Sequence, residues 1–116
     1  MIAAAFLLLT AQASVAPPSA EAMGDATRAF GTCVESNIAA VPASATPEAG
    51  AARVRAACAN QIARLEQLSA QLINSNTQAT PEQKTAWLAQ MRTNLGAVEG
   101  QLAEMIRNQR AQPASN

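Results

Sequence analysis

Residues 46–74 read TPEAGAARVRAACANQIARLEQLSAQLIN. The Thr46 hydroxyl can accept a hydrogen bond from a free N–H group of the first turn, Pro47 suits the first helical position, and Glu48 complements the positive end of the helix dipole. Apolar residues then recur at steps of three and four, which places them on one face of a helix. Asn and Ser side chains at 74–77 favour a turn. We therefore predict one helix over residues 46–74, roughly 42 Å long.

A helix is also predicted on each side of this stretch. Residues 21–40 carry apolar side chains at helical spacing, and Pro42 ends the pattern. A third helix begins at Thr80, where Gln83 completes a capping box, and runs to about residue 110. Its inner positions follow a heptad pattern: Leu88, Met91, Leu95, Val98, Leu102 and Met105.

The predicted fold is all-α, an up-down-up three-helix bundle. Residues 46–74 and 80–110 form a long antiparallel hairpin, and the shorter helix over 21–40 packs along part of it, because short connections make antiparallel neighbours. A two-helix hairpin that dimerises into a four-helix bundle is the alternative. The bundle domain is expected to span residues 21–110, followed by a disordered tail at 111–116.

The N-terminus predicts export. Residues 1–13 resemble a secretory signal peptide, with a short apolar run and small residues that predict cleavage after Ala13. No Lys or Arg precedes the run, so a retained apolar N-terminus is the alternative. Residues 14–20 are expected to form a Pro-rich flexible leader. The mature chain is predicted to be periplasmic or secreted, without stable membrane insertion.

Two cysteines lie on the inner faces of the first two helices. Antiparallel packing brings Cys33 and Cys58 to similar heights, and a pair of cysteines in an exported chain most simply forms a disulfide. A redox pair or two free core thiols are the other interpretations. A redox pair is disfavoured because the cysteines lack a C-x-x-C spacing.

The residue types exclude many chemistries. The chain has no His and no Tyr, so the common catalytic dyads, haem sites and zinc sites lack their residues. The eight acidic residues are scattered mostly over outer faces, and no glycine-rich phosphate loop is present. The net charge is zero with both signs interspersed, which argues against nucleic-acid binding. We expect no enzymatic activity, no metal site and no cofactor.

The remaining candidate is a surface for protein contact. The first helix is about 30 Å long and cannot cover the whole hairpin, so its tip is expected to stay uncovered. Trp and Met are enriched at protein interfaces. The alternative is that Trp87 closes the end of the bundle under the leader. The partner-binding candidates at the tip are Leu68, Leu72, Ile73, Trp87, Leu88 and Met91.

Two glycines mark a second smooth surface. Gly96 and Gly100 form a G-x-x-x-G face on the third helix. Because glycine weakens a helix by about 1 kcal/mol relative to alanine, these positions suggest a close contact. We expect close packing against the first helix or simple tolerance of the glycines; the alternative is a homodimer or partner-helix contact.

Residues 79–83, Ala-Thr-Pro-Glu-Gln, resemble the L-T-x-x-Q motif of small helical periplasmic chaperones of the Spy type, with Ala79 in place of the Leu. The resemblance implies an ATP-independent, holdase-like chaperone or a stress-response role. The two function classes are therefore a non-enzymatic structural or protein-binding role in the envelope, with an unknown partner or as a homodimer, and such a chaperone.

Overall fold

The computed structural model describes residues 19–112. The predicted signal peptide, most of the leader and residues 113–116 lie outside this range. Within it the chain is all-helical, as predicted, with no strand among the described residues. The helices are α2 (Ala20–Ala39), α3 (Pro47–Ala57), α4 (Ala59–Asn74), α5 (Pro81–Gly96) and α6 (Val98–Ala111).

Side-chain caps set the helix starts. The Thr46 hydroxyl accepts from the Ala49 N–H at 3.1 Å. At Thr80 the capping box is complete, because the hydroxyl accepts from the Gln83 N–H at 3.1 Å and the Gln83 Oε1 accepts from the Thr80 N–H at 2.9 Å. Both predicted starts are confirmed. Ser19 caps α2 in the same way, accepting from the Ala22 N–H at 3.0 Å.

The two long predicted helices are each divided by a bend. Cys58, with φ −103° and ψ 17°, separates α3 from α4, and Ala97 separates α5 from α6. Helical hydrogen bonds cross both points, from the Cys58 N–H to the Val54 carbonyl and from the Gln101 N–H to the Ala97 carbonyl. The chain therefore forms three arms, namely α2, the bent α3–α4 arm and the bent α5–α6 arm.

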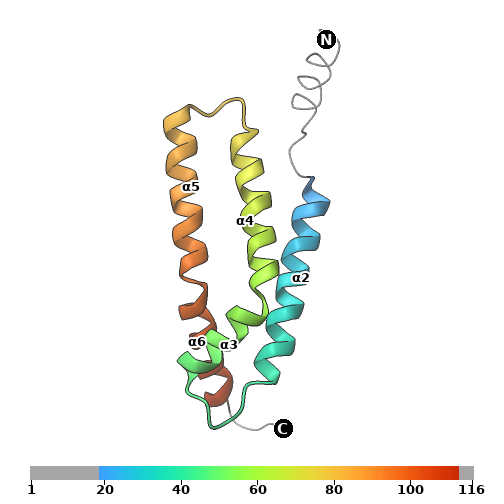
Figure 1. Ribbon diagram of the computed structural model, residues 1–116, viewed down its shortest axis with the longest axis vertical. Helices are drawn as coiled ribbons and strands as arrows, with labels where there is room; N and C mark the ends of the chain where they lie inside the picture. The colour runs from blue at the N-terminus through green and yellow to red at the C-terminus, as the bar shows by residue number, and fades with distance from the viewer. Residues whose placement is uncertain (1–18, 113–116) are drawn as a thin grey trace, which may run out of the picture.

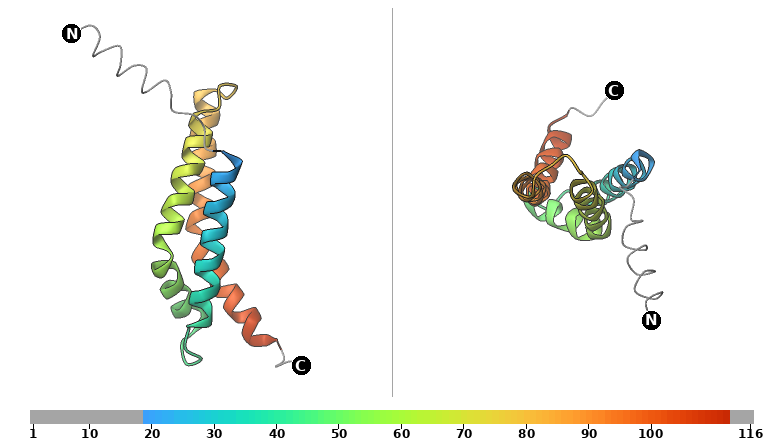
Figure 2. Two further views of the ribbon diagram at one scale, coloured as in Figure 1. Left: turned by 90° about the vertical axis from the view of Figure 1, so that its right-hand side faces the viewer. Right: turned by 90° about the horizontal axis from the view of Figure 1, so that it is seen from above.

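The arms pack as a partly open bundle. α2 packs on α3 and α4, α4 packs on α5, and α3 packs on α6. Among residues 19–112, α2 makes no comparable packing with α5 or α6. Figure 1 shows α5, α4 and α2 side by side, and the view from above in Figure 2 shows that α2 and α5 lie on either side of α4. The up-down-up order is as predicted, with an opening between α2 and the α5–α6 arm.

The core lies at the base of the molecule, where α3 crosses α6. Its buried members come from all three arms: Val34, Ala51, Val54, Cys58, Ile62, Val98, Leu102, Ala103 and Ile106. Gly50 permits this crossing, because a Cβ there would lie 2.8 Å from Val41 Cγ1 and 3.1 Å from Ile106 Cδ1. Gly50 was not among the glycines that the sequence pattern predicted to make a close contact, which were Gly96 and Gly100.

Polar contacts join the arms around this core. Arg107 of α6 pairs with Glu48 of α3 and also with Glu104. The Arg110 Nη2 donates to the Pro42 carbonyl at 3.1 Å, which links the end of α6 to the α2–α3 connection. These exposed pairs contribute little each, so the apolar crossing dominates the stability of the base.

Candidate interaction surface

The disulfide fixes the position of α2 along the hairpin. Cys33 and Cys58 are joined, with their Cα atoms 5.9 Å apart, which confirms the predicted pairing. The Asn37 Nδ2 donates to the Cys33 carbonyl at 2.8 Å beside the bond. α2 begins 13 residues before Cys33 (33 − 20), and 13 residues after Cys58 in the antiparallel α4 is Gln71 (58 + 13). α2 therefore covers α4 only as far as about Gln71, and the tip of the hairpin extends beyond it.

The predicted tip residues divide into three groups. Leu72 and Trp87 are exposed, with 47% and 41% of their surface accessible. Ile73, Leu88 and Met91 are half-buried. Leu68 is 3% exposed, so its side chain belongs to the packing between helices rather than to the surface.

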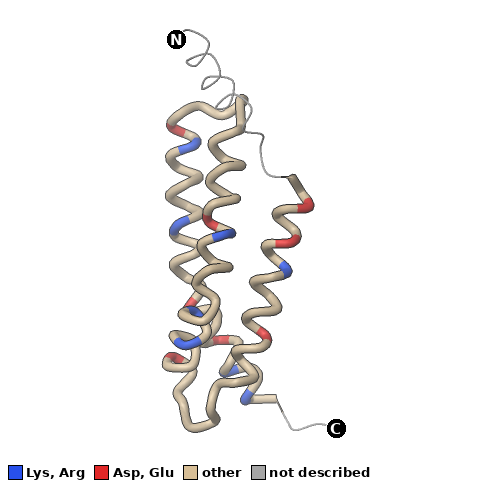
Figure 3. The backbone as a smooth tube through the Cα atoms, turned by 45° about the vertical axis from the view of Figure 1, so that its right-hand side comes forward, with Lys and Arg blue, Asp and Glu red and all other residues tan. Residues whose placement is uncertain are grey.

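The tip is uncharged as well as apolar. No Lys, Arg, Asp or Glu occurs from Gln67 to Pro81. Figure 3 shows this part of the hairpin as an unbroken tan stretch between charged positions. The Lys84 Nζ donates to the Asn74 carbonyl at 3.0 Å, which links the two helices of the hairpin. The cation nearest to the tip is therefore engaged in a hydrogen bond. Leu72 therefore lies within an uncharged segment, whereas Trp87 lies outside it, about one helical turn from Lys84.

A groove between α2 and α6 was not predicted. Phe30 and Val34 from α2, with Val98, Leu102 and Met105 from α6, line a cavity of about 220 Å³. Next to it, a cavity of about 430 Å³ is lined by Glu35, Ile38, Met105, Asn108, Gln109 and Gln112. The two cavities share Met105 and Glu35, so they form one groove along the lower part of the open side.

Met105 belongs to this groove and not to the core. The heptad pattern placed it on the inner stripe, yet it is 47% exposed while Ile106 is 3% exposed. An α-helix has about 3.6 residues per turn, so a seven-residue pattern drifts by about 20° per heptad. After two heptads the buried face has moved to Ala103 and Ile106, and Met105 has turned toward the opening.

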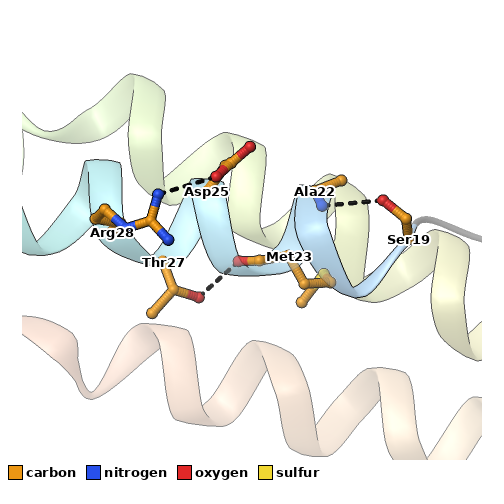
Figure 4. Close-up of polar contacts among 6 residues, drawn as sticks. All are labelled: Ser19, Ala22, Met23, Asp25, Thr27 and Arg28. Atoms are coloured by element: carbon orange, nitrogen blue, oxygen red, sulfur yellow. Dashed lines mark hydrogen bonds and ion pairs between the residues drawn. The ribbon is translucent and has the colours of Figure 1, made fainter.

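The upper part of α2 presents uncharged side chains to the same opening. Figure 4 shows Met23 and Thr27 on the side of α2 turned toward the α5–α6 arm. The Thr27 hydroxyl donates to the Met23 carbonyl at 2.9 Å, which satisfies its donor within the helix. Asp25 and Arg28 pair with each other at 3.0 Å. Glu104 and Arg107 form a second pair of this kind on α6, at 3.2 Å.

The G-x-x-x-G face lies open. A Cβ placed on Gly96 or Gly100 would meet nothing within 4 Å. The expectation that these glycines pack closely against the first helix is wrong, because α2 lies on the other side of the α5–α6 arm. Their role in any contact between chains stays a prediction.

No group of three His, Cys, Asp or Glu in residues 19–112 could hold a metal ion, and none of the described helices is long and apolar enough to cross a bilayer. Comparison of the chain with protein-family models, curated proteins and solved structures gave no match. The candidate interaction surfaces are the exposed apolar residues of the tip and, toward the opposite end of the molecule, the groove between α2 and α6.

Proposed function

We propose that this chain is a non-enzymatic protein of the periplasm or extracellular space that binds another protein through the tip of its α4–α5 hairpin. One observation carries the proposal: Leu72 and Trp87 are exposed at the end that α2 leaves uncovered. A large aromatic side chain with aliphatic neighbours is the usual centre of a protein interface. The uncharged segment around Leu72 lowers the cost of removing charged groups from water on contact.

The disulfide supports the compartment. Such bonds persist in the periplasm and in secreted proteins and are rare in reducing compartments. Both cysteines of the chain are in the bond. Export through the predicted signal peptide accounts for an oxidised pair in a domain of this size.

The mature protein is expected to begin at Ser14 and to carry no reactive thiol. Intact mass spectrometry of the endogenous protein from fractionated cells, alkylated with and without prior reduction, measures both features. Alkylation should add mass at two sites only after reduction. A full-length chain that is alkylated without reduction would contradict both export and the cross-link.

Partner binding is expected to depend on the tip. In pull-downs from envelope extracts with the disulfide-intact protein, Trp87→Ala and Leu72→Asp should each lose the specific partner, because the apolar contact is truncated or charged. Gln90→Ala, an exposed position on the same helix, is the matched control and should retain it. Retention of every specific partner by both tip variants would exclude this surface.

A holdase-like chaperone is the second candidate, and the groove favours it. Met105 lines the groove and Met91 is half-buried near the tip. Flexible methionines suit surfaces that adapt to many partners. The 79–83 motif adds no separate support, since its Thr80 and Gln83 are fully engaged in a helix cap. Suppression of client aggregation at stoichiometric amounts would favour this function over a single dedicated partner.

A further inference from the structure

The exposed side chains of the tip and of the groove lie on one line along the α5–α6 arm. Trp87 and Met105 are 18 residues apart (105 − 87), which is five complete turns at about 3.6 residues per turn. Hydrogen bonds continue through the bend at Ala97, so the two residues keep the same angular position. Met105 faces the opening toward α2, and Trp87 therefore faces the same side.

The line forms a second heptad strip beside the one that contacts α4. It advances in alternating steps of four and three residues. Such spacing lets a helix pack continuously against another helix. We call these positions the open strip: Trp87, Met91, Asn94, Val98, Gln101 and Met105. Val98 is only 9% exposed and forms the floor of the strip, where it joins the core.

We propose that the open strip is the contact between two copies of this chain, paired antiparallel about a two-fold axis. This deepens the proposed function and rests on it, because it names a second copy as the protein that covers Trp87. The midpoint between Trp87 and Met105 is residue 96, beside the bend. A two-fold axis at this point places Trp87 of each copy against Met105 of the other, so that an apolar side chain meets an apolar side chain at both ends of the strip.

The absence of charge on the strip fits a self-contact. In a two-fold dimer the same patch meets itself, so a charged patch would set like charges together. The described part of the α5–α6 arm carries seven charged residues, and none occupies the open strip: Glu82, Lys84, Arg92, Glu99, Glu104, Arg107 and Arg110. Its polar members are neutral, and the Gln90 Nε2 already donates to Asn94 Oδ1 at 3.1 Å.

The available area suits a reversible dimer. The strip is about 27 Å long, and beside α5 the opening toward α2 is about two interhelical distances, or about 18 Å, wide. The opening narrows at the groove, where α2 and α6 line the same cavity. The area is therefore below about 500 Å² per copy, which is the size of a weak, reversible contact. A dissociation constant in the micromolar range is the corresponding expectation.

Sedimentation of the purified, disulfide-intact chain tests the proposal without any foreign partner. The mass should rise from one chain to two between about 1 µM and about 1 mM. Trp87 is the only Trp, so its emission should shift to shorter wavelength over the same range as the ring leaves water. A constant single-chain mass would overturn the dimer and leave the partner-binding proposal standing, because that proposal is tested by the pull-down.

Charge exchange tests the antiparallel geometry. Trp87→Lys and Met105→Glu should each weaken self-association at least about tenfold, because a charge is placed against an apolar side chain. Mixing the two variants should restore dimerisation. In the mixed dimer, the Lys at position 87 of one copy meets the Glu at position 105 of the other, and the second contact is the native one between Trp87 and Met105. Failure of the mixture to associate would overturn the pairing.

Ala89→Glu is the matched control. Ala89 is exposed and lies with Gly96 and Gly100 on the other face of the same arm. The variant should dimerise like the wild type. Loss of the dimer in Ala89→Glu with retention in Met105→Glu would assign the contact to the glycine face and overturn the proposal.

Discussion

Reduction of the Cys33–Cys58 disulfide is expected to lower the unfolding temperature by about 15–25 °C. The cross-link closes a separation of 25 residues, for which loop entropy gives about 3.5 kcal/mol. The native contacts offer little compensation, because only Ala26 and Val34 of α2 are buried. The effect is therefore large relative to the stability of a small domain.

Thermal unfolding followed by circular dichroism measures the change, with and without a dithiol reductant. The variant in which Cys33 and Cys58 are both replaced by Ala is the control, and the reductant should leave its transition unchanged. Comparing the oxidised and reduced wild type isolates the cross-link from the loss of side-chain packing at Cys58, which is 0% exposed. Oxidised and reduced transitions within a few degrees would show that packing alone holds α2.

Loss of the bond should act first on α2. The α3–α6 crossing and the α4–α5 hairpin are contacts between other helices, and α2 adds only Val34 to the buried core. Hydrogen exchange of the reduced protein should therefore show early loss of protection in α2, while α6 amides stay protected. Detachment of α2 would then expose Val98 and Leu102, which are 9% and 3% exposed in the intact structure.

Local chemistry made the helices and the disulfide predictable from the sequence. Thr46 and Thr80 are followed by Pro and Glu, and such starts depend on residues within one turn. The cysteines were predictable because antiparallel order and equal distance from the α2–α3 connection suffice to align them. Each of these features requires only short-range spacing or the order of the helices.

The opening was not predictable because periodicity gives a direction and not a distance. Ala26 is buried and Cys33 is bonded to Cys58, so small residues hold α2 against the α3–α4 arm. The helical spacing of these residues does not indicate how far α2 stands from α5. The heptad pattern also assigned Met105 to the core, whereas the structure buries its neighbour Ile106. Which of the two side chains is buried depends on the path of the α5–α6 arm through the bend at Ala97.

Three leucines of the α5–α6 arm allow a direct test of where the stability lies. Leu88, Leu95 and Leu102 are seven residues apart and equivalent by pattern. In the structure Leu102 is 3% exposed in the core, whereas Leu88 is half-buried near the tip. Leu102→Ala should lower the free energy of unfolding by about 3 kcal/mol, through lost burial and a residual cavity. Leu88→Ala should lower it by about 1 kcal/mol, because its site is open and can relax.

Urea titration of the two oxidised variants measures the difference, and Leu102→Met is the control. Met keeps most of the volume of Leu, so this variant should lose less than about 1.5 kcal/mol. Equal losses in Leu88→Ala and Leu102→Ala would mean that the apolar contacts are spread evenly along the hairpin and that the tip is covered in solution. A threefold difference would instead place the stability at the α3–α6 crossing, which leaves the tip side chains of Trp87 and Leu72 free to bind without cost to the fold.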